Sequence, residues 1–327
     1  MNDKKKNNIL FNFFCDAKMN AVEKLSEYLF LRKDDVKRAL VYGCTVESFI
    51  NDLKIDLNKG DSSEVGIIGR HITTSSDERI SSFRNTGLLN LRAALEVGTP
   101  LSDFLKKHKI KIDVDNRIFN FKAYSIPIEG TKLPDHRCFM GHDKVCSWSS
   151  GCDAFQKLGI LDNKLYNLGA TLEFFVAGTL DEMLEYSSVS RCPEILVTID
   201  ELISCIHNPY RECTYPLCCD WMSTYPNCYA IEFESCLSNM ETFEPINYLN
   251  AFEEIKNCFL WSNITYYDYY ERRVPQRVFD NIYLIRRIID IYVYGSKEQY
   301  GSLQPGFSID SDELKLYRVD GKMLIEV

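Results

Sequence analysis

Apolar positions in the first sixty residues recur at the three- and four-residue spacing of helices, so the chain is expected to begin with a helical region, residues 1–60. Val22, Leu25 and Leu29 make the first stripe, a second segment ends at Gly43, and Thr45 is placed to cap a third. No segment carries the basic face that groove reading requires. A helical layer packed on the remainder is therefore favoured over a helix-turn-helix module.

The pattern changes after the turn-forming residues 59–63, where short alternating segments begin to interleave with helical ones. Strands are expected at residues 65–73, 110–114, 117–128, 170–177, 228–236, 298–303, 314–319 and 323–327. Helices are expected at residues 77–86, 88–95, 101–108, 179–186, 245–260 and 274–294, whereas residues 195–206 suit either state. Polar, cysteine-rich residues 134–159 and 208–227 are interpreted as insertions.

Short amphipathic strands joined by tight turns favour an α+β fold with mostly antiparallel sheets over a parallel doubly wound fold. No Gly-x-Gly-x-x-Gly follows a strand, and no Gly-Lys-Ser/Thr motif is present, so nothing in the sequence indicates a dinucleotide fingerprint or a P-loop. We expect residues 61–327 to form one large domain that contains both insertions.

The net charge of −9 argues against a mainly electrostatic nucleic-acid binder. The acidic excess is concentrated in residues 125–250, which contain 7 basic and 18 acidic side chains. The two ends of the chain can still offer a local basic face. No apolar run reaches the length of a membrane span, and the basic and apolar N-terminus has no cleavage-type pattern, so a cytoplasmic protein without membrane contact is expected.

Thirteen cysteines in a chain without a secretion signal indicate free buried thiols or metal ligands rather than disulfides. Two groups contain histidine: Cys138, His142, Cys146 and Cys152, and Cys205, His207, Cys213, Cys218, Cys219 and Cys228. Neither group has the two paired Cys-x2–4-Cys knuckles of a structural zinc site. Buried thiols with no metal are favoured, and zinc stays an alternative.

The sequence Arg70-His71-x-Thr73 places a cation, an imidazole and a hydroxyl together at the end of an expected strand. This combination suits an anionic, ribose-rich ligand. A solvated Arg70 and a structurally satisfied His71 explain the same residues equally well.

With the helix after it and Gly87-Leu88, this stretch resembles the first motif of the ADP-ribosyltransferase superfamily. Residues 172–176 followed by residues 179–186 are similar to the family's middle motif, a strand and helix that place an aromatic ring against nicotinamide. Glu298, at the start of a late strand, resembles the glutamate of the third motif. The resemblance implies an antiparallel split sheet and NAD as the substrate.

The resemblance also implies a role for each residue. Glu298 would be the catalytic carboxylate that faces the oxocarbenium-like centre formed when the nicotinamide–ribose bond breaks. His71 and Thr73 would bind the ribose or the amide of NAD, and Arg70 the pyrophosphate. Tyr186 is favoured as the ring on nicotinamide. Phe175 and Tyr124 compete with it for that place.

The leading hypothesis is therefore an ADP-ribosyltransferase that modifies a protein or nucleic-acid acceptor. By the same resemblance it would act as a bacterial toxin or phage-defence effector, with a neutralising partner protein. The alternative is a non-enzymatic interaction or regulatory protein, with or without stabilising zinc. The run Tyr266-Tyr267-x-Tyr269-Tyr270, followed by Arg272-Arg273, could stack the bases of a single-stranded nucleic acid. The interleaved acids favour a packed surface segment.

Overall fold

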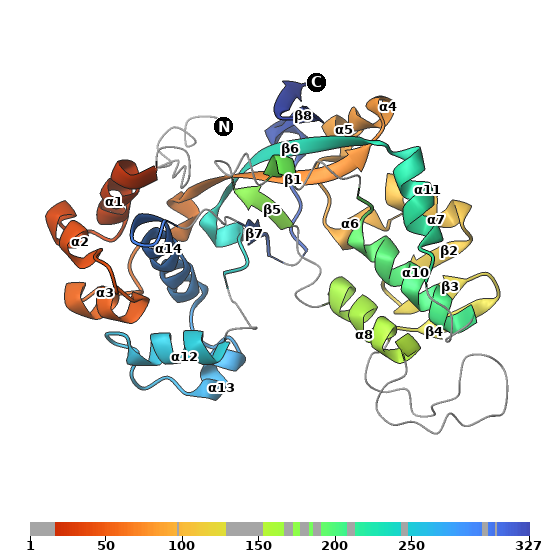
Figure 1. Cartoon of the computed structure of the whole chain (residues 1–327). Coiled ribbons are helices and arrows are strands. Elements are labelled where there is room, and N and C mark those ends of the chain that lie inside the picture. Colours follow the sequence, from red (N-terminus) through yellow and green to blue (C-terminus); the bar gives the residue numbers. More distant parts are fainter. Residues whose placement is uncertain are drawn as a thin grey trace. The chain divides into compact units, whose positions relative to one another are not determined.

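The computed structural model describes residues 17–96, 98–128, 153–166, 173–176, 183–185, 191–207, 213–242, 248–295, 300–304 and 306–327. The chain divides into two compact units (Figure 1). Unit 1 combines residues 1–70, 173–183 and 232–303, and unit 2 combines residues 71–172, 184–231 and 304–327. Strands β1 (Gly66–Ser75) and β6 (Asn227–Cys236) run through both units.

Unit 1 is mainly helical. Its elements are α1 (Ala17–Tyr28), α2 (Lys33–Ala39), α3 (Val46–Leu53), α12 (Tyr248–Asn257), α13 (Tyr266–Tyr270), α14 (Gln276–Tyr292), β5 (Glu173–Val176) and β7 (Tyr300–Ser302). The three helices expected in residues 1–60 are confirmed. Thr45 caps α3 as expected, because its hydroxyl accepts the N–H of Ser48 while the Ser48 hydroxyl accepts the N–H of Thr45.

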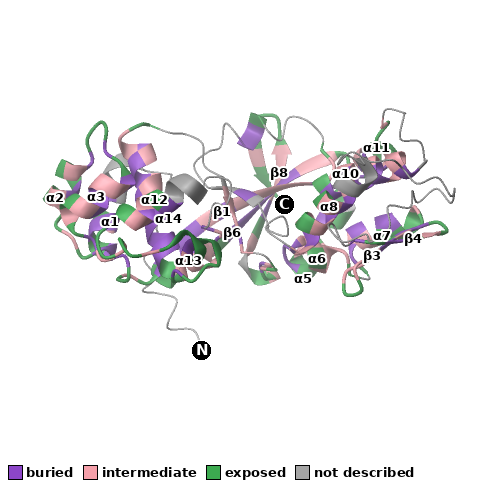
Figure 2. Ribbon diagram, turned by 90° about the horizontal axis from the view of Figure 1, so that it is seen from below, coloured by how far each residue is buried: buried purple, intermediate pink, exposed green. Residues whose placement is uncertain are grey.

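Helix α14 is the centre of unit 1, and most of its residues from Val278 to Ile291 are buried (Figure 2). Helices α1 and α3 pack against it. A buried amide joins the distant segments: Asn281 accepts the hydroxyl of Tyr28 at 2.8 Å and donates to the carbonyls of Leu57 and Lys59 at 2.8 and 2.9 Å. The N-terminal helices are therefore tied to the late helix by polar contacts as well as by apolar packing.

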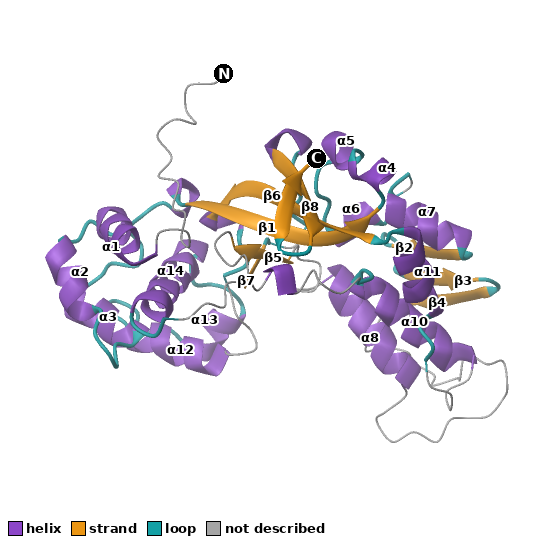
Figure 3. Cartoon of the chain, turned by 45° about the horizontal axis from the view of Figure 1, so that its top comes forward, coloured by secondary structure: helices purple, strands orange, loops and turns teal. Residues whose placement is uncertain are grey.

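Unit 2 mixes helices with a three-stranded sheet (Figure 3). Its elements are α4 (Asp77–Ile80), α5 (Phe83–Thr86), α6 (Leu91–Ala94), α7 (Pro100–Lys107), β2 (Ile110–Asp113), β3 (Ile118–Phe121), β4 (Tyr124–Pro127), α8 (Asp153–Tyr166), α10 (Glu194–His207), α11 (Pro216–Thr224), β8 (Leu314–Asp320) and β9 (Met323–Glu326). The chain turns between β3 and β4 at Lys122, whose φ of 52° splits the expected long strand in two.

The larger sheet has the strand order β7-β5-β1-β6-β8-β9, and the smaller one the order β2-β3-β4. The pairs β1–β5, β5–β7, β8–β9, β2–β3 and β3–β4 are all antiparallel. The predicted α+β class with antiparallel sheets is confirmed at this level.

Both expected insertions contain packed helices where the structure describes them, so neither is irregular throughout. Helix α8 begins at Asp153, inside the first insertion, and α11 occupies much of the second. Leu217, Cys218, Trp221 and Tyr225 of the second insertion enter one hydrophobic core with α7, α8, α10 and the smaller sheet. Cysteine, tryptophan and tyrosine made this segment look irregular, but in the fold they are its apolar face.

Residues 88–95 were expected to be helical throughout, but only Leu91–Ala94 is. Leu88 instead exchanges backbone hydrogen bonds with Ile309, both 2.9 Å long. This pairing requires the glycine before it: Gly87 has a φ of 72°, and a Cβ there would lie 2.2 Å from the Ile309 carbonyl oxygen. Within the described residues, no helix is long and apolar enough to cross a membrane.

Candidate functional site

Strand β1 carries the first three candidate residues, and its packing begins with Gly69. A Cβ at this position would lie 2.6 Å from Cζ of Phe233 and 2.7 Å from Cδ2 of Phe174. These two rings meet edge to face, with centroids 5.2 Å apart. The face of β1 that contains Gly69 is therefore filled by aromatic side chains at this point.

Arg70, the next residue, forms an ion pair with Glu232 on β6. Its Nε and Nη2 atoms donate to the same oxygen, Oε2, at 2.9 and 2.8 Å. The Glu232 side chain is only 10% exposed and that of Arg70 only 19%, so the pair is largely withdrawn from water. Because a guanidinium has five N–H donors, two on Glu232 leave three for an anionic ligand. Arg70 is thus held in place by the protein without being saturated by this contact.

His71 and Thr73 follow on the same strand and are half-buried. Residues two apart on a strand share a face, and adjacent residues face opposite ways. His71 and Thr73 are therefore brought to one face, and Arg70 to the other. The sequence had grouped all three into one cluster.

The neighbouring Thr74 has a structural role. Its hydroxyl donates to the carbonyl of Arg191 at 3.0 Å and accepts the indole N–H of Trp221 at 2.9 Å. Thr74 is buried, and these bonds join β1 to α11 and to the segment before α10. This hydroxyl is therefore used within unit 2 and is not offered to a ligand.

The three segments that carry the sequence motifs lie on adjacent strands. In β5, Phe175 is the register partner of Arg70 on one side and of Tyr300 in β7 on the other. One row across the sheet thus connects positions 70, 175 and 300, which are more than a hundred residues apart along the chain. Glu298, the expected catalytic residue, and Tyr186, the expected stacking residue, lie outside the described residues.

The two competing aromatic residues are placed differently. Phe175 stands in this row by its backbone register. Tyr124 begins β4, pairs with Phe121 in the smaller sheet and packs against the hydrophobic core of unit 2. Tyr124 therefore has a structural role in the core of unit 2.

Two carboxylates near these strands were not singled out by the sequence. One is Glu232, which alternates with the apolar Ile231 and Phe233 in the segment 228–236 and has the same parity as the exposed Glu234, so nothing in the sequence indicated that it is buried. The other is Asp77, the first residue of α4. It accepts hydrogen bonds from the Tyr229 hydroxyl and from Asn227, and the first of these lowers the pKa of the Asp77 carboxyl. Burial and the same contact raise the pKa of Tyr229 to about 12.

The cysteines among the described residues are free thiols. Cys218 donates its backbone N–H to the buried carboxylate of Asp200, as does Leu217, each at 3.0 Å, so Asp200 holds the first turn of α11. Burial raises the pKa of Asp200, and those two N–H groups oppose the rise. In the part of the chain that the structure describes, no three or more His, Cys, Asp or Glu side chains are arranged to hold a metal ion. Cys138, His142, Cys146 and Cys152 lie outside it.

The chain matches no protein-family model, no curated protein and no solved structure. A functional assignment therefore has to start from the residues and the strand arrangement alone. These offer a guanidinium fixed by a buried carboxylate, an imidazole and a hydroxyl on the opposite face of the same strand, and two further strands in register beside it.

Proposed function

We propose that this chain is an NAD-dependent ADP-ribosyltransferase with an α+β fold of that family's split-sheet type. The observation that carries the proposal is the adjacency of β1, β5 and β7, on which the three motif segments lie. A single NAD molecule has to touch all three motifs, so segments this distant in sequence must meet in space.

In this proposal His71 and Thr73 bind the ribose and amide of NAD, and Tyr186 stacks on nicotinamide. Glu298 hydrogen-bonds the ribose and stabilises the positive charge that develops as nicotinamide leaves. Arg70 has one of two roles, depending on which face of β1 binds NAD. If NAD lies on its face of β1, its remaining donors bind the pyrophosphate. If NAD lies on the face of His71 and Thr73, Arg70 holds β1 to β6 through Glu232.

The test is incubation of the purified chain with NAD labelled in its adenylate portion, together with bacterial protein and nucleic acid as acceptors. We expect release of nicotinamide and labelling of an acceptor. Glu298→Gln should reduce both by about 10²- to 10³-fold, the cost of removing one electrostatic stabiliser. Glu234→Gln is the matched control, because Glu234 is an exposed carboxylate on β6. Neither release nor labelling with the unmodified chain would contradict the proposal.

Variants of Arg70 distinguish its two possible roles, binding the pyrophosphate and holding β1 to β6. Arg70→Lys keeps the charge but loses the forked donors. Weaker NAD binding with an unchanged melting temperature would place the pyrophosphate at Arg70. A lower melting temperature with unchanged NAD affinity would assign Arg70 to structure, and His71→Ala should then weaken NAD binding.

A toxin or phage-defence setting, with a neutralising partner protein, belongs to the same proposal. Expression in the bacterial cytoplasm is expected to arrest growth, and the Glu298→Gln variant is expected not to. A second candidate, a non-enzymatic interaction protein, is favoured by one observation, the exposed aromatic residues of unit 1. Its zinc-stabilised form requires stoichiometric zinc in the purified chain, measured by elemental analysis.

A further inference from the structure

The tyrosine run near α13 does not pack as a unit. Tyr269 is 1% exposed and contacts the rings of Phe252 and Phe279 in the core of unit 1. Its neighbours Tyr266, Tyr267 and Tyr270 are 40%, 55% and 59% exposed. One tyrosine therefore anchors the helix, and three present their rings at the surface.

The three exposed rings are ordered. Tyr266 and Tyr270 are stacked with centroids 6.2 Å apart and an interplanar angle of 19°. The guanidinium of Arg273 lies over the Tyr267 ring, 4.6 Å from its centroid. Successive residues of a helix are rotated by about 100° around its axis. Tyr267 therefore projects from the helix between the direction of the stacked pair, Tyr266 and Tyr270, and the direction of Asp268. This surface therefore presents two stacked tyrosine rings and, beside them, the ring of Tyr267 covered by the guanidinium of Arg273.

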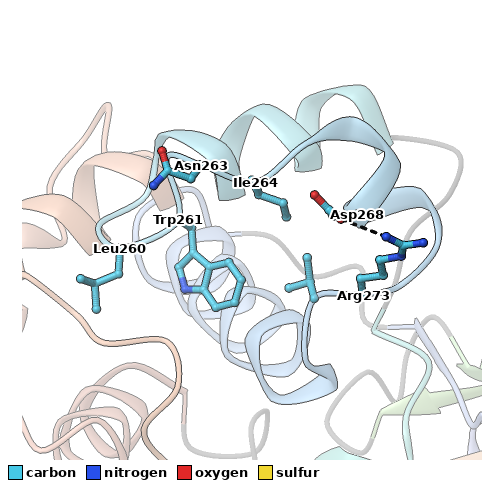
Figure 4. A pocket seen from close by; sticks show the side chains of 7 residues that line it. Leu260, Trp261, Asn263, Ile264, Asp268 and Arg273 are labelled. Atoms are coloured by element: carbon cyan, nitrogen blue, oxygen red, sulfur yellow. Dashed lines mark ion pairs between the residues drawn. The ribbon is translucent and has the colours of Figure 1, made fainter.

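A pocket of about 300 Å³ opens next to Arg273 (Figure 4). Leu260, Trp261, Ile264 and Val274 give it an apolar lining, and Asn263, Asp268 and Arg273 add polar groups. The side chains of Asp268 and Arg273 point toward each other in Figure 4 and form an ion pair, in which Nη1 of Arg273 and Oδ1 of Asp268 are 3.8 Å apart, a separation too long for a hydrogen bond. The Arg273 side chain is 58% exposed, so its donors are accessible to a ligand.

The indole N–H of Trp261 is buried and has no hydrogen-bond partner among the described residues. A buried donor without a partner costs free energy, and a ligand that accepts this N–H would remove that cost. Two residues that flank the helix also have backbones in the left-handed region: Leu260 with a φ of 71° and Arg272 with a φ of 52°. Such conformations are held at a cost and cluster at binding sites.

Arg273 is the cation that an anionic occupant would meet at this surface. Its neighbour Arg272 pairs with Glu241 at 3.2 Å, and Lys256 lies 4.0 Å from Glu253. The surface therefore offers one exposed guanidinium rather than a general basic excess. An exposed guanidinium beside aromatic faces is the combination that single-stranded nucleic acids need, one group for the phosphate and the other for the base.

We infer that the α13 surface binds single-stranded nucleic acid. The α13 surface consists of Tyr266, Tyr267, Tyr270, Arg273 and the pocket lined by Trp261. Unpaired bases stack on the tyrosines, one base enters the pocket, and Arg273 contacts the adjoining phosphate. A proline-rich peptide would also use aromatic faces, but it would not need the guanidinium of Arg273 beside them.

The test is fluorescence anisotropy of labelled oligo-dT and oligo-U of about 15 nucleotides, which span a typical single-strand site, with the full chain at low salt and no NAD. We expect micromolar binding, weakened about tenfold by Tyr267→Ala and by Tyr270→Ala, the loss of one stacking contact each. Arg273→Ala should weaken binding and reduce the salt dependence by about one released ion. Tyr42→Ala is the matched control, because Tyr42 is 91% exposed on another part of unit 1.

The inference is overturned if neither oligonucleotide binds at about 100 µM protein, the weak end of non-specific affinity. It is also overturned if the α13 variants bind as tightly as the unmodified chain. A labelled uncharged proline-rich peptide is run in parallel. If that peptide binds, loses affinity in Tyr267→Ala and the oligonucleotides do not bind, the surface is a peptide site. Since no assay contains NAD, these outcomes are independent of the proposed transferase activity.

Discussion

The α13 surface of unit 1 and the hydrophobic core of unit 2 use aromatic residues in opposite ways. In unit 2, Trp221 is buried between Phe104 and Tyr225, with ring centroids 5.0 and 4.3 Å away, and its N–H bonds to Thr74. In unit 1, Trp261 lies at a pocket with its N–H unpartnered, beside exposed tyrosines. Both segments are rich in aromatic residues; the first was expected to be an insertion and the tyrosine run of the second to be a packed surface segment.

The difference shows that aromatic content alone does not separate a core from a binding surface. The core and the surface differ in whether the polar group of each aromatic side chain has a hydrogen-bond partner. The indole N–H and the rings of unit 2 are satisfied within the fold, so they stabilise it. On the α13 surface the buried indole N–H of Trp261 has no hydrogen-bond partner among the described residues, and the rings of Tyr267 and Tyr270 are more than half exposed. Four measurements test this difference between the two regions.

The largest effect is expected in the core of unit 2. Trp221→Ala should lower the free energy of unfolding by about 3–5 kcal/mol, because it leaves a cavity and removes the N–H that the Thr74 hydroxyl accepts. Urea unfolding followed by circular dichroism measures this loss. Trp221→Phe keeps a ring and should cost less than Trp221→Ala. A loss below about 1 kcal/mol in the alanine variant would mean that α11 is the surface insertion the sequence suggested.

The next effect concerns the amide that ties unit 1 together. Asn281→Ala removes partners from Tyr28 and from the carbonyls of Leu57 and Lys59, and should cost about 2–3 kcal/mol because buried polar groups lose their hydrogen bonds. Thermal and urea unfolding give the value. The control is Asn263→Ala, an exposed asparagine at the α13 surface, expected to change stability by about 0.5 kcal/mol or less.

A smaller effect should appear as opposite pH dependences of two aspartates. Burial raises the pKa of Asp280. The folded state therefore binds that proton more tightly, and this contribution to stability is present at low pH and is lost as pH rises through the folded pKa. Hydrogen bonds from Thr265 lower the pKa of Asp268, so its contribution is present above the unfolded pKa and is lost as pH falls.

Asp280→Asn should therefore gain stability relative to the unmodified chain as pH rises from 3 to 7, and Asp268→Asn should lose it. The two series of unfolding free energies, measured over that pH range, give the slopes directly. If the difference in unfolding free energy from the unmodified chain changed with pH in the same direction in both variants, the burial assigned to Asp280 or the hydrogen bonding assigned to Asp268 would be contradicted.

The smallest effect is the sharpest test of the α13 surface. Tyr267→Ala and Tyr270→Ala should change the free energy of unfolding by about 0.5 kcal/mol or less, whereas Tyr269→Ala, in the core, should cost about 3 kcal/mol or more. Melting temperatures of the three variants separate the positions. If Tyr267→Ala destabilises as strongly as Tyr269→Ala, the exposed rings have a structural role and the comparison fails.

Much of the local structure follows from sequence signals that act within a few residues. The apolar period of α14, the cap at Thr45 and the alternation of β6 were each sufficient to predict their element. Helix α11 was missed because its buried face is built from Leu217, Cys218 and Trp221, and no clear stripe marks it. Residues 195–206 were ambiguous because a helix buried on much of its surface loses its amphipathic period.

For the candidate site, the sequence identified β1 and its polar residues but not their geometry. It could not show that Arg70 is paired with Glu232, because the two are 162 positions apart and only strand register brings them together. Nor could it show that His71 and Thr73 share a face that Arg70 does not. The alternation of a strand is simple, but the motif was treated as one cluster.

Signals within the sequence were enough to predict many of the helices and strands, their apolar faces and an α+β chain with antiparallel pairing. These properties depend on side-chain period and on hydrogen bonds to residues three or four positions away. Only the tertiary structure decided that β1, β5 and β7 are neighbours, that Trp221 is buried and that Tyr267 is exposed. Those outcomes depend on contacts between distant segments, and their free energy is gained only when the whole chain is packed.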